Sequence, residues 1–364
     1  MNAPIPMVDT AAEYRALKTE IDSAVVRVLA SGRYVLGPEG EALERELGAY
    51  VGAPHAVGCN SGTDALHLAL VAAGIGSGDE VVLPAFTFFA TAEAVSYTGA
   101  TPIFADIDAR SFNVTADSLE QRLSPRTRAV IVVHLFGQCA PLEAIASLCK
   151  KKNLVLVEDC AQALGAEYQG RRAGSWGDFG CFSFYPTKNL AAAGDAGLIT
   201  TRSPDYDRIL RMLRHHGSRQ TYLHERVGWN SRLDELQAAL LRVKLAHLDR
   251  FNEARRSAAG LYRRRLAGKD LILPAEHGRG THVYHQFTVR STKRDALREA
   301  LARESIAASV FYPIPLHRQP AYEAAGRGLS LPVSEKISGE VLSLPINPLL
   351  DATSIERICQ VLAR

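Results

Sequence analysis

Residues 154–161 read LVLVEDCA, and this stretch decides the fold class. Its run of four apolar residues predicts a strand buried on both faces, as in a parallel sheet covered by helices. Outward from it, strand and helix patterns alternate from about residue 57 to residue 201. We expect strands at 56–60, 80–85, 101–107, 129–134, 179–186 and 197–201, and helices at 61–74, 88–99, 115–123 and 142–153. This alternation predicts a doubly wound α/β domain.

A second, smaller domain is expected after the alternating region. Ser231 and Asp234 have the spacing of a capping box, which predicts one long helix from there to Leu266. Beyond it we expect strands at 285–290 and 309–314, a helix at 293–304, and a last helix opened by Thr353. We therefore divide the chain into a large domain, 1–250, and a small C-terminal domain, 251–364.

The composition is that of a soluble globular protein. The chain has 364 residues, of which 47% are apolar and 22% are charged. It has no run of 18 apolar residues, and its N-terminal stretch lacks the apolar core of a signal peptide. None of the six cysteines stands in a C-x-x-C pair, so we expect no metal site. These features predict a cytoplasmic protein without a membrane span.

The net charge of +3 is unevenly distributed. Between Arg208 and Arg265 there are 14 basic and 5 acidic residues, a net of +9, so the rest of the chain carries −6. Such a band can be a solvated helix face, a nucleic-acid surface or a site for an anionic ligand.

In open α/β sheets, ligands bind beyond the carboxyl ends of the strands. Gly62 and Thr63 follow a predicted strand and open a helix, where backbone N–H groups can hold a phosphate. The alternative is an ordinary helix N-cap. The glycines at 74, 76 and 78 lack the spacing of a dinucleotide fingerprint and follow a helix, so we predict a turn there. Their pattern disfavours a nicotinamide-dependent dehydrogenase.

Asp159 and Lys188 are the strongest candidates for chemistry. A carboxylate at the end of so apolar a strand is costly unless a cation meets it, although Asp159 could instead cap a helix. Lys188 stands among apolar residues in SFYPTKNL, where partial desolvation would lower its pKa and allow an imine with an aldehyde. Gln162 and Ser183 could bind the same ligand. Together these groups describe pyridoxal 5′-phosphate, which needs a lysine and a carboxylate that keeps its ring nitrogen protonated.

These residues resemble the DegT-type nucleotide-sugar aminotransferases, within the fold-type I pyridoxal-phosphate enzymes. The resemblance covers nearly the whole chain, through SGRYVLGPEGEALE, NSGTDALHLAL, GDEVVLPAFTFFATAEAV, VEDCAQALGA, FSFYPTKNL, GWNSRLDELQAA and FYPIPLHRQPAY. It implies a large domain with a mostly parallel sheet and a smaller C-terminal α+β domain.

The resemblance also implies roles for individual residues. Lys188 would form the imine with the cofactor and move the substrate proton, and Asp159 would pair with the ring nitrogen. Gln162 would contact the ring hydroxyl and Phe88 would stack on the ring. The phosphate would be held by Gly62, Thr63 and Ser183.

Three further residues would act at the substrate end of the site. Asn230 would reach the phosphate from the other subunit of a homodimer, so the two subunits would share their active sites. Arg232 and His317 are the candidates for substrate binding, because a guanidinium suits a sugar carboxylate. The alternative for Arg232 is an ion pair with Asp234 or Glu235.

The chain departs from the family pattern after the lysine. The family usually reads KNLGxxGDGG, whereas alanine stands here at 191 and 196. Members that dehydrate their substrate have histidine in place of the lysine, so Lys188 favours transamination.

The expected reaction transfers an amino group from L-glutamate to a keto group of a nucleotide-activated sugar. The first expectation for the substrate is UDP-2-acetamido-3-keto-glucuronate, in polysaccharide (including lipopolysaccharide) or glycoconjugate amino-sugar biosynthesis. The alternatives are a dTDP-3- or 4-keto-6-deoxyhexose, or a non-catalytic regulatory protein on the same fold. Neither nucleic acid nor membrane is expected as a partner.

Overall fold

The computed structural model describes residues 3–220 and 222–363. Its central sheet has seven strands in the order β1-β9-β8-β5-β4-β2-β3. Their bounds are β1 (His55–Cys59), β2 (Glu80–Pro84), β3 (Thr101–Ala105), β4 (Thr127–Val133), β5 (Val155–Asp159), β8 (Phe179–Ser183) and β9 (Gly197–Thr201). Strand β9 runs antiparallel to β1 and β8, and the other neighbouring pairs are parallel. The sheet confirms the predicted α/β class, with the LVLVEDCA stretch at its centre.

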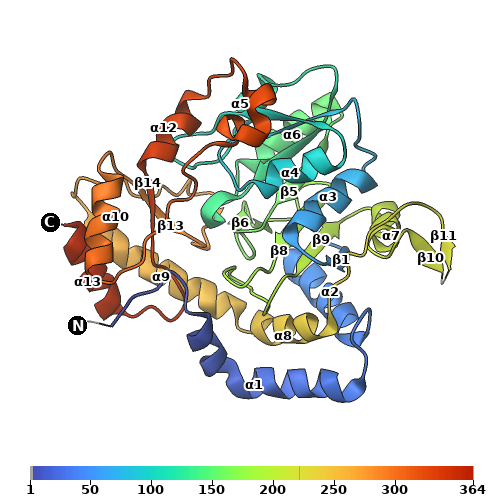
Figure 1. Ribbon diagram of the computed structural model, residues 1–364, viewed down its shortest axis with the longest axis horizontal. Helices are drawn as coiled ribbons and strands as arrows, with labels where there is room; N and C mark the ends of the chain where they lie inside the picture. The colour runs from blue at the N-terminus through green and yellow to red at the C-terminus, as the bar shows by residue number, and fades with distance from the viewer. Residues whose placement is uncertain (1–2, 221, 364) are drawn as a thin grey trace.

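Helices cover both faces of this sheet (Figure 1). Alternate residues of β4 show why, because Ile131 packs into one hydrophobic core and Val130 into the other. The core around Ile131 includes residues of α3 (Gly62–Ala72), α4 (Ala90–Tyr97) and α7 (Pro204–Leu213). The core around Val130 includes residues of α2 (Pro38–Val51), α5 (Ala116–Glu120), α6 (Leu142–Lys152) and α8 (Glu235–Leu245).

The C-terminal part of the chain has its own core. It is built from α9 (Leu248–Leu266), β13 (Phe287–Arg290), α10 (Arg294–Arg303), β14 (Val341–Leu344) and α13 (Ala352–Leu362). Ile5 belongs to this core, because its backbone pairs with residues 305 and 307. The N-terminal segment therefore packs on the small domain, and the boundary near residue 250 stays a prediction.

The remaining elements lie at the periphery. Helix α1 (Thr10–Ser31) runs beside α8, and β10 (Ser218–Gln220) with β11 (Leu223–His224) projects from the end of α7 (Figure 1). A small sheet is formed by β6 (Glu167–Tyr168), β7 (Arg171–Arg172) and β12 (Gly280–Thr281). Short helical segments are η1 (Leu135–Gly137), η2 (Leu316–Arg318), η3 (Pro320–Tyr322), α11 (Glu323–Gly326) and α12 (Pro332–Glu340). Across 3–220 and 222–363, no helix combines the length and hydropathy needed to span a bilayer.

Three local expectations were wrong. The long helix to Leu266 is two helices, α8 and α9, and Ser231 makes no capping box, because its Oγ donates to Asp64 at 2.6 Å. Residues 309–314 form no strand, since Ser309 makes only an isolated bridge to Ser343. The last helix begins at residue 352 and is capped by Asp351 instead of Thr353. A long-range contact overrides the local signal at Ser231, whereas at the last helix one local cap, Asp351, replaces another.

Candidate active site

A cavity of about 380 Å³ opens at the carboxyl ends of β5 and β8. Seven of the ten predicted site residues line it, namely Gly62, Thr63, Phe88, Asp159, Gln162, Ser183 and Lys188. The cavity lies where the rule for parallel sheets places a ligand. The other three, Asn230, Arg232 and His317, lie outside it.

Lys188 stands in the turn that follows β8. Its backbone N–H donates to the carbonyl of Tyr185 at 2.8 Å, which closes the turn and directs the residue toward the cavity. Burial lowers the pKa of Lys188 to about 8, and the nearby carboxylate of Asp159 opposes this shift. Deprotonation of the lysine is therefore brought to within about one pH unit of neutrality, and the neutral amine is the form that makes an imine.

Asp159 is the last residue of β5, and its carboxylate is buried. It accepts hydrogen bonds from Thr91 Oγ1 at 2.9 Å and from the backbone N–H of Ala161 at 3.1 Å. Burial raises the pKa of Asp159, and these two hydrogen bonds only partly offset that effect. No helix follows it directly in the described chain, so the alternative of a helix cap is wrong. The side chain suits a cationic partner that enters with a ligand.

The N-terminus of α3 forms the third part of the cavity. Ser61 caps the helix, because its Oγ accepts from the backbone N–H of Asp64 at 3.1 Å. A Cβ on Gly62 would lie 2.6 Å from the Cβ of Ser183, so the backbone approaches that serine too closely for any other residue. The free N–H groups, the helix dipole and the hydroxyls of Thr63 and Ser183 make an anion site. The cap at Ser61 therefore leaves room for a phosphate site at the same helix end, which stays a prediction.

Gln162 is fixed by two hydrogen bonds. Its Oε1 accepts from the backbone N–H of Phe136 at 2.6 Å, and its Nε2 donates to the hydroxyl of Tyr312 at 3.1 Å. Burial raises the pKa of Tyr312, which keeps its hydroxyl protonated. The ring of Phe88 lies 6.1 Å from the ring of Tyr312, so the two aromatic residues border the cavity together.

Tyr312 was missed by the sequence analysis, although it lies within the FYPIPLHRQPAY stretch. Within that stretch we selected His317, which is buried elsewhere and forms a 3.0 Å contact from Nε2 to Glu335 Oε1. The placement of His317 does not support direct contact with the substrate. Thr91 was also missed, because its hydrogen bond to Asp159 joins residues 68 positions apart.

Asn230 and Arg232 lie beyond the cavity, close to His215. Asn230 is exposed, and an isolated backbone bridge joins it to His215. Arg232 Nη1 lies 3.4 Å from His215 Nδ1. No ion pair joins Arg232 to Asp234 or Glu235 among the described residues, so the predicted alternative of a helix-start pair is not observed.

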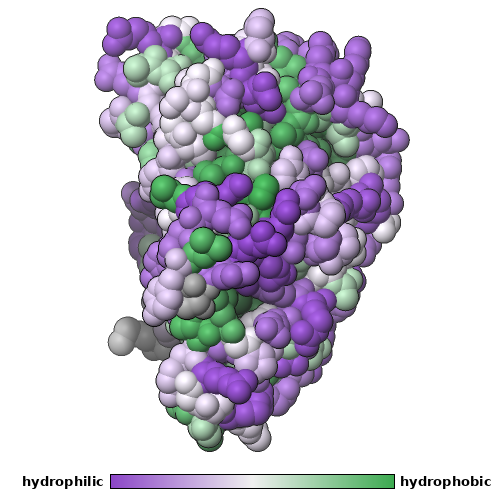
Figure 2. All heavy atoms as spheres, turned by 90° about the vertical axis from the view of Figure 1, so that its right-hand side faces the viewer, coloured by the Kyte–Doolittle hydropathy of each residue, from purple (hydrophilic) through white to green (hydrophobic). Residues whose placement is uncertain are grey.

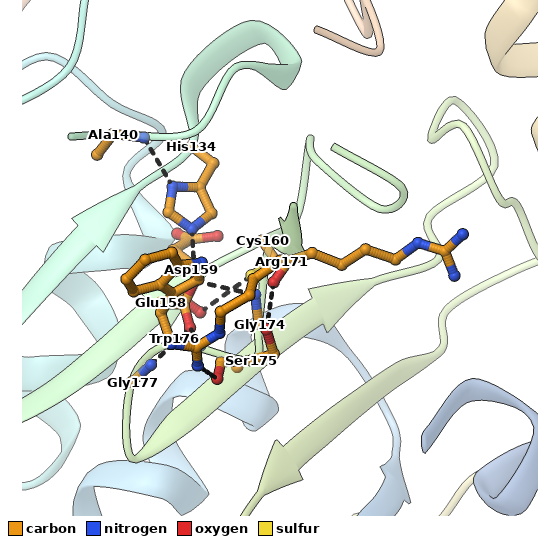
Figure 3. A network of polar contacts seen from close by, with 12 residues as sticks. His134, Ala140, Glu158, Asp159, Cys160, Arg171, Gly174, Ser175, Trp176 and Gly177 are labelled. Carbon is orange, nitrogen blue, oxygen red and sulfur yellow. Dashed lines mark hydrogen bonds and ion pairs between the residues drawn. The ribbon is translucent and has the colours of Figure 1, made fainter. Parts of the chain in front are cut away.

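A network of polar contacts lies behind the site (Figure 3). Glu158 is fully buried and accepts backbone N–H groups from Gly174, Trp176 and Gly177 at 2.7–2.9 Å. Its fourth donor is His134 Nε2 at 2.9 Å. Burial alone would raise the pKa of Glu158, but the hydrogen bonds from His134 and the backbone hold it below its usual value. The carboxylate is therefore a stable buried anion.

The tautomer of His134 follows from its second contact. Its Nδ1 accepts from the backbone N–H of Ala140 at 3.1 Å, so the ring proton is on Nε2. His134, Glu158 and Cys160 lie close enough together to resemble a metal site. However, the two nitrogens and the carboxylate oxygens are already engaged in hydrogen bonds, so the cluster anchors the 174–177 loop instead.

Ala191 and Ala196 are both buried. The backbone N–H of Phe184 donates to the carbonyl of Ala196 at 2.9 Å, and that of Ala192 donates back to Phe184 at 2.7 Å. Neither alanine adopts a positive φ. The loop after Lys188 therefore accommodates both added Cβ atoms without backbone strain.

The basic band is largely neutralised by the fold. Arg211 and Arg214 both pair with Glu44, at 2.8 and 2.5 Å. Seven further basic residues of the band also pair with carboxylates, namely Arg208, Arg219, Arg242, Lys244, Arg256, Arg263 and Arg265. The charge excess in the sequence therefore does not by itself mark an anion site.

The groups around the cavity fit pyridoxal 5′-phosphate. Asp159 is a buried carboxylate without a cation in ion-pair contact among the described residues, and a ring N–H⁺ would supply one. The N-terminus of α3 offers a cradle in which a Cβ at residue 62 has no room. Lys188 has the lowered pKa that an imine-forming lysine needs. Asp159 matches the ring nitrogen of the cofactor, the N-terminus of α3 matches its phosphate, and Lys188 matches its aldehyde.

Comparison with known proteins leads to the same chemistry. Residues 15–363 match the DegT/DnrJ/EryC1/StrS aminotransferase family. The chain is 48% identical to a UDP-N-acetyl-3-dehydro-α-D-glucosamine 3-aminotransferase of Acidithiobacillus ferrooxidans, covering 100% of this chain and 98% of the relative. It is 48% identical to a dTDP-3-amino-3,4,6-trideoxy-α-D-glucose transaminase of Streptomyces venezuelae, covering 97% and 94%. It is 40% identical to a UDP-2-acetamido-2-deoxy-3-oxo-D-glucuronate aminotransferase of Pseudomonas aeruginosa, covering 98% and 99%.

Solved structures agree with these relatives. The structure of S. venezuelae DesV in complex with a ketimine intermediate superposes with a TM-score of 0.97 at 46% identity, covering 100% of this chain and 98% of that one. The pyridoxal-phosphate form of a putative sugar aminotransferase from Streptococcus pneumoniae superposes with a TM-score of 0.89 at 28% identity, covering 95% of each chain.

Proposed function

The chain belongs to the DegT/DnrJ/EryC1/StrS aminotransferase family, and from this premise we propose that it aminates the C3 keto group of a UDP-2-acetamido sugar with L-glutamate as the donor. It is a pyridoxal-phosphate enzyme that acts on keto sugars carried by a nucleotide. The identity of the sugar, the carbon that is aminated and the amino-group donor are what we propose. The relatives with UDP and with dTDP sugars are equally similar in sequence, so the proposal for UDP depends on direct assay.

We assign the cofactor to seven residues of the cavity. When bound, pyridoxal 5′-phosphate takes an amino group from one substrate and passes it to the next. Asp159 would hold the ring nitrogen protonated, and Lys188 would hold the aldehyde carbon and, as a free amine, move the substrate proton. Gln162 would bind the ring hydroxyl and Phe88 would contact the ring. The phosphate is assigned to Gly62, Thr63 and Ser183.

The charges of the cavity favour a sugar that is neutral at C6. Lys188 is the single lysine or arginine among its lining residues, and Asp159 and Asp195 are the carboxylates. With Asp159 paired to the ring nitrogen, a uronate carboxylate would still meet the carboxylate of Asp195 and no free cation among the described lining residues of one subunit. This observation supports a 3-keto-N-acetylglucosamine substrate over the expected 3-keto-glucuronate.

The uronate remains a second candidate because of Arg232. Its guanidinium lies outside the cavity of its own chain, and a second subunit could present it to a carboxylate. The chain shortly before Arg232 forms an exposed arm, residues 222–227, where Tyr222 is 94% and Val227 is 86% exposed. Figure 2 faces the side from which this arm projects and shows hydrophobic patches among hydrophilic ones. These features support a homodimer with shared sites, which is also proposed.

A substrate panel tests the function. The purified enzyme is given L-glutamate with the 3-keto forms of UDP-N-acetylglucosamine, UDP-N-acetylglucosaminuronate and a dTDP-6-deoxyhexose, and the products are identified by mass. We expect amination of the first with at least tenfold higher kcat/KM than of the others, which corresponds to about 1.4 kcal/mol of discrimination. A preference for the uronate that disappears in Arg232→Ala would support the second candidate instead.

Borohydride treatment tests the role of Lys188 separately. Reduction of the yellow holoenzyme should fix the cofactor on the peptide that contains Lys188, as read by peptide mass. Cofactor fixed on another lysine would contradict the assignment whatever the sugar is.

A further inference from the structure

Two buried threonines lie between the cavity wall and Asp159. Thr87 follows β2 and lines the cavity at 3% exposure, and Thr91 lies in the first turn of α4 and is fully buried. Thr91 Oγ1 donates to Asp159 Oδ2 at 2.9 Å, and Thr87 Oγ1 lies 3.1 Å from Thr91 Oγ1. No role was expected for either threonine from the sequence. Their hydroxyls form a continuous line of contacts that ends on the carboxylate.

The direction of these hydrogen bonds can be deduced. A hydroxyl carries one hydrogen, and that of Thr91 is directed at Asp159. In the contact between the two threonines Thr91 can therefore only accept, so Thr87 is the donor. A hydroxyl that accepts a hydrogen bond becomes a stronger donor, because bonds in a chain polarise one another. The chain runs from Thr87 through Thr91 to Asp159 and stabilises a negative charge on Oδ2.

The hydroxyl of Thr91 does not follow the common pattern of a helix. Serine and threonine in a helix often donate to a backbone carbonyl of the preceding turn, as Ser96 of α4 does to Ala92 at 3.2 Å. Thr91 instead donates to a carboxylate 68 positions later in the chain. Because a buried hydroxyl is costly unless it is hydrogen-bonded, its contact with Asp159 is what makes a threonine suitable at this position.

The carboxylate of Asp159 has one donor on each oxygen. Oδ1 accepts from the backbone N–H of Ala161 at 3.1 Å, and Oδ2 accepts from Thr91. Among the described residues, no second side chain forms a hydrogen bond with this carboxylate. The two donors fix the plane of the carboxylate and leave each oxygen with a free lone pair for a ligand. Thr91 is therefore the side chain through which the fold orients Asp159.

We propose that Thr91, supported by Thr87, is a positioning residue that keeps Asp159 ionised and oriented for the protonated ring nitrogen of pyridoxal 5′-phosphate. Thr91 does not line the cavity itself, so it acts through Asp159. The inference rests on the proposed pairing of Asp159 with the ring nitrogen, which Asp159→Asn tests separately.

Three substitutions isolate the hydroxyl groups. Thr91→Val keeps the shape of the side chain and removes the donor to Asp159. Thr91→Ser is the matched control, because it keeps the donor and removes only the methyl group. Thr87→Val removes only the first donor of the chain, and it provides an independent test if Thr91→Val does not fold.

The experiment compares two cofactors that differ at the ring nitrogen. Cofactor-free enzyme is titrated, by absorbance, with pyridoxal 5′-phosphate and with its 1-deaza analogue, in which C–H replaces the ring nitrogen while the aldehyde and phosphate remain. We expect Thr91→Val to weaken binding of the natural cofactor about tenfold, because a hydrogen bond to a charged group is lost. Its affinity for the analogue should change less than about twofold, because the analogue brings no ring N–H⁺ that requires an ionised Asp159.

The two other threonine variants should give graded results. Thr91→Ser should bind both cofactors as the wild type does. Thr87→Val should weaken binding of the natural cofactor by about two- to threefold and leave that of the analogue unchanged, because it removes only the polarisation of Thr91. An equal loss with both cofactors in Thr87→Val would remove Thr87 from the chain.

Other results for Thr91→Val overturn the proposal. Equal losses with both cofactors would assign Thr91 to packing, and unchanged affinities for both would show that Asp159 does not depend on it. Asp159→Asn should weaken binding of the natural cofactor at least tenfold and that of the analogue little. If Asp159→Asn distinguishes the cofactors and Thr91→Val does not, only the threonine chain is refuted. If Asp159→Asn does not distinguish them, the pairing of Asp159 with the ring nitrogen is refuted as well.

Discussion

Glu158 and Asp159 are adjacent carboxylates at the end of β5, and their surroundings shift their pKa values in opposite directions. Four donors surround Glu158 and hold its pKa below its usual value. Asp159 has two donors, and burial raises its pKa. The charge of Glu158 is stabilised by donors within the fold, whereas Asp159 needs a cation that a ligand brings. Alternation along the strand sends the two side chains to opposite faces, so one can anchor a loop while the other serves the cavity.

We predict that Glu158→Gln destabilises the protein by about 3 kcal/mol at pH 7, because an amide NH₂ would face backbone N–H groups. Urea unfolding measures the difference, with the exposed Glu41→Gln as the matched control. The lowered pKa of Glu158 means that its stabilisation is complete above about pH 4.5 and is lost as the pH falls through the folded value. The difference in unfolding free energy between wild type and Glu158→Gln should therefore become smaller below pH 4.5. A gap that widens in acid would contradict an anionic Glu158.

The element at which a single methyl group matters most is the first turn of α3. We predict that Gly62→Ala weakens pyridoxal-phosphate binding about tenfold or more, because the new Cβ would lie 2.6 Å from the Cβ of Ser183 and push the phosphate cradle apart. Absorbance titration of cofactor-free enzyme measures the affinity. The control is Gly76→Ala, whose Cβ meets its nearest neighbour, the Thr98 carbonyl, at an ordinary 3.7 Å. Equal affinities in the two variants would remove residue 62 from the phosphate site.

The elements also show what the sequence could predict. The strand ends carried enough information to bring Asp159, Ser183 and Lys188 together, because parallel strands end at one edge. Local signals failed where distant contacts decide. Ser231 donates its hydroxyl to Asp64 instead of capping a helix, and His285 reaches the cavity from the segment just before β13. No periodicity or motif encodes such contacts.

At the scale of the whole molecule, the proposed shared site predicts complementation between two inactive variants. Lys188→Ala lacks the lysine, and Asn230→Asp places a charge against the phosphate. If Asn230 acts across the interface, mixed dimers contain one intact site, and random mixing restores about a quarter of wild-type activity. Activity after co-refolding is measured against each variant alone. Restoration should be absent if Asn230 serves its own subunit.

The packing of Ile5 sets an order of events during synthesis. Its N–H donates to the Ser305 carbonyl and its carbonyl accepts from Ala307, both at 2.9 Å, and Arg357 holds the carbonyl of Ala3 at 2.7 Å. Residues 3 and 5 are thus bound by residues about 300 or more positions later in the chain. While the central sheet is synthesised and folds, the N-terminal segment lacks its contacts with residues 305, 307 and 357. Proteases should therefore cleave this segment in nascent chains arrested before residue 305. Chains that extend past residue 357 should resist cleavage there.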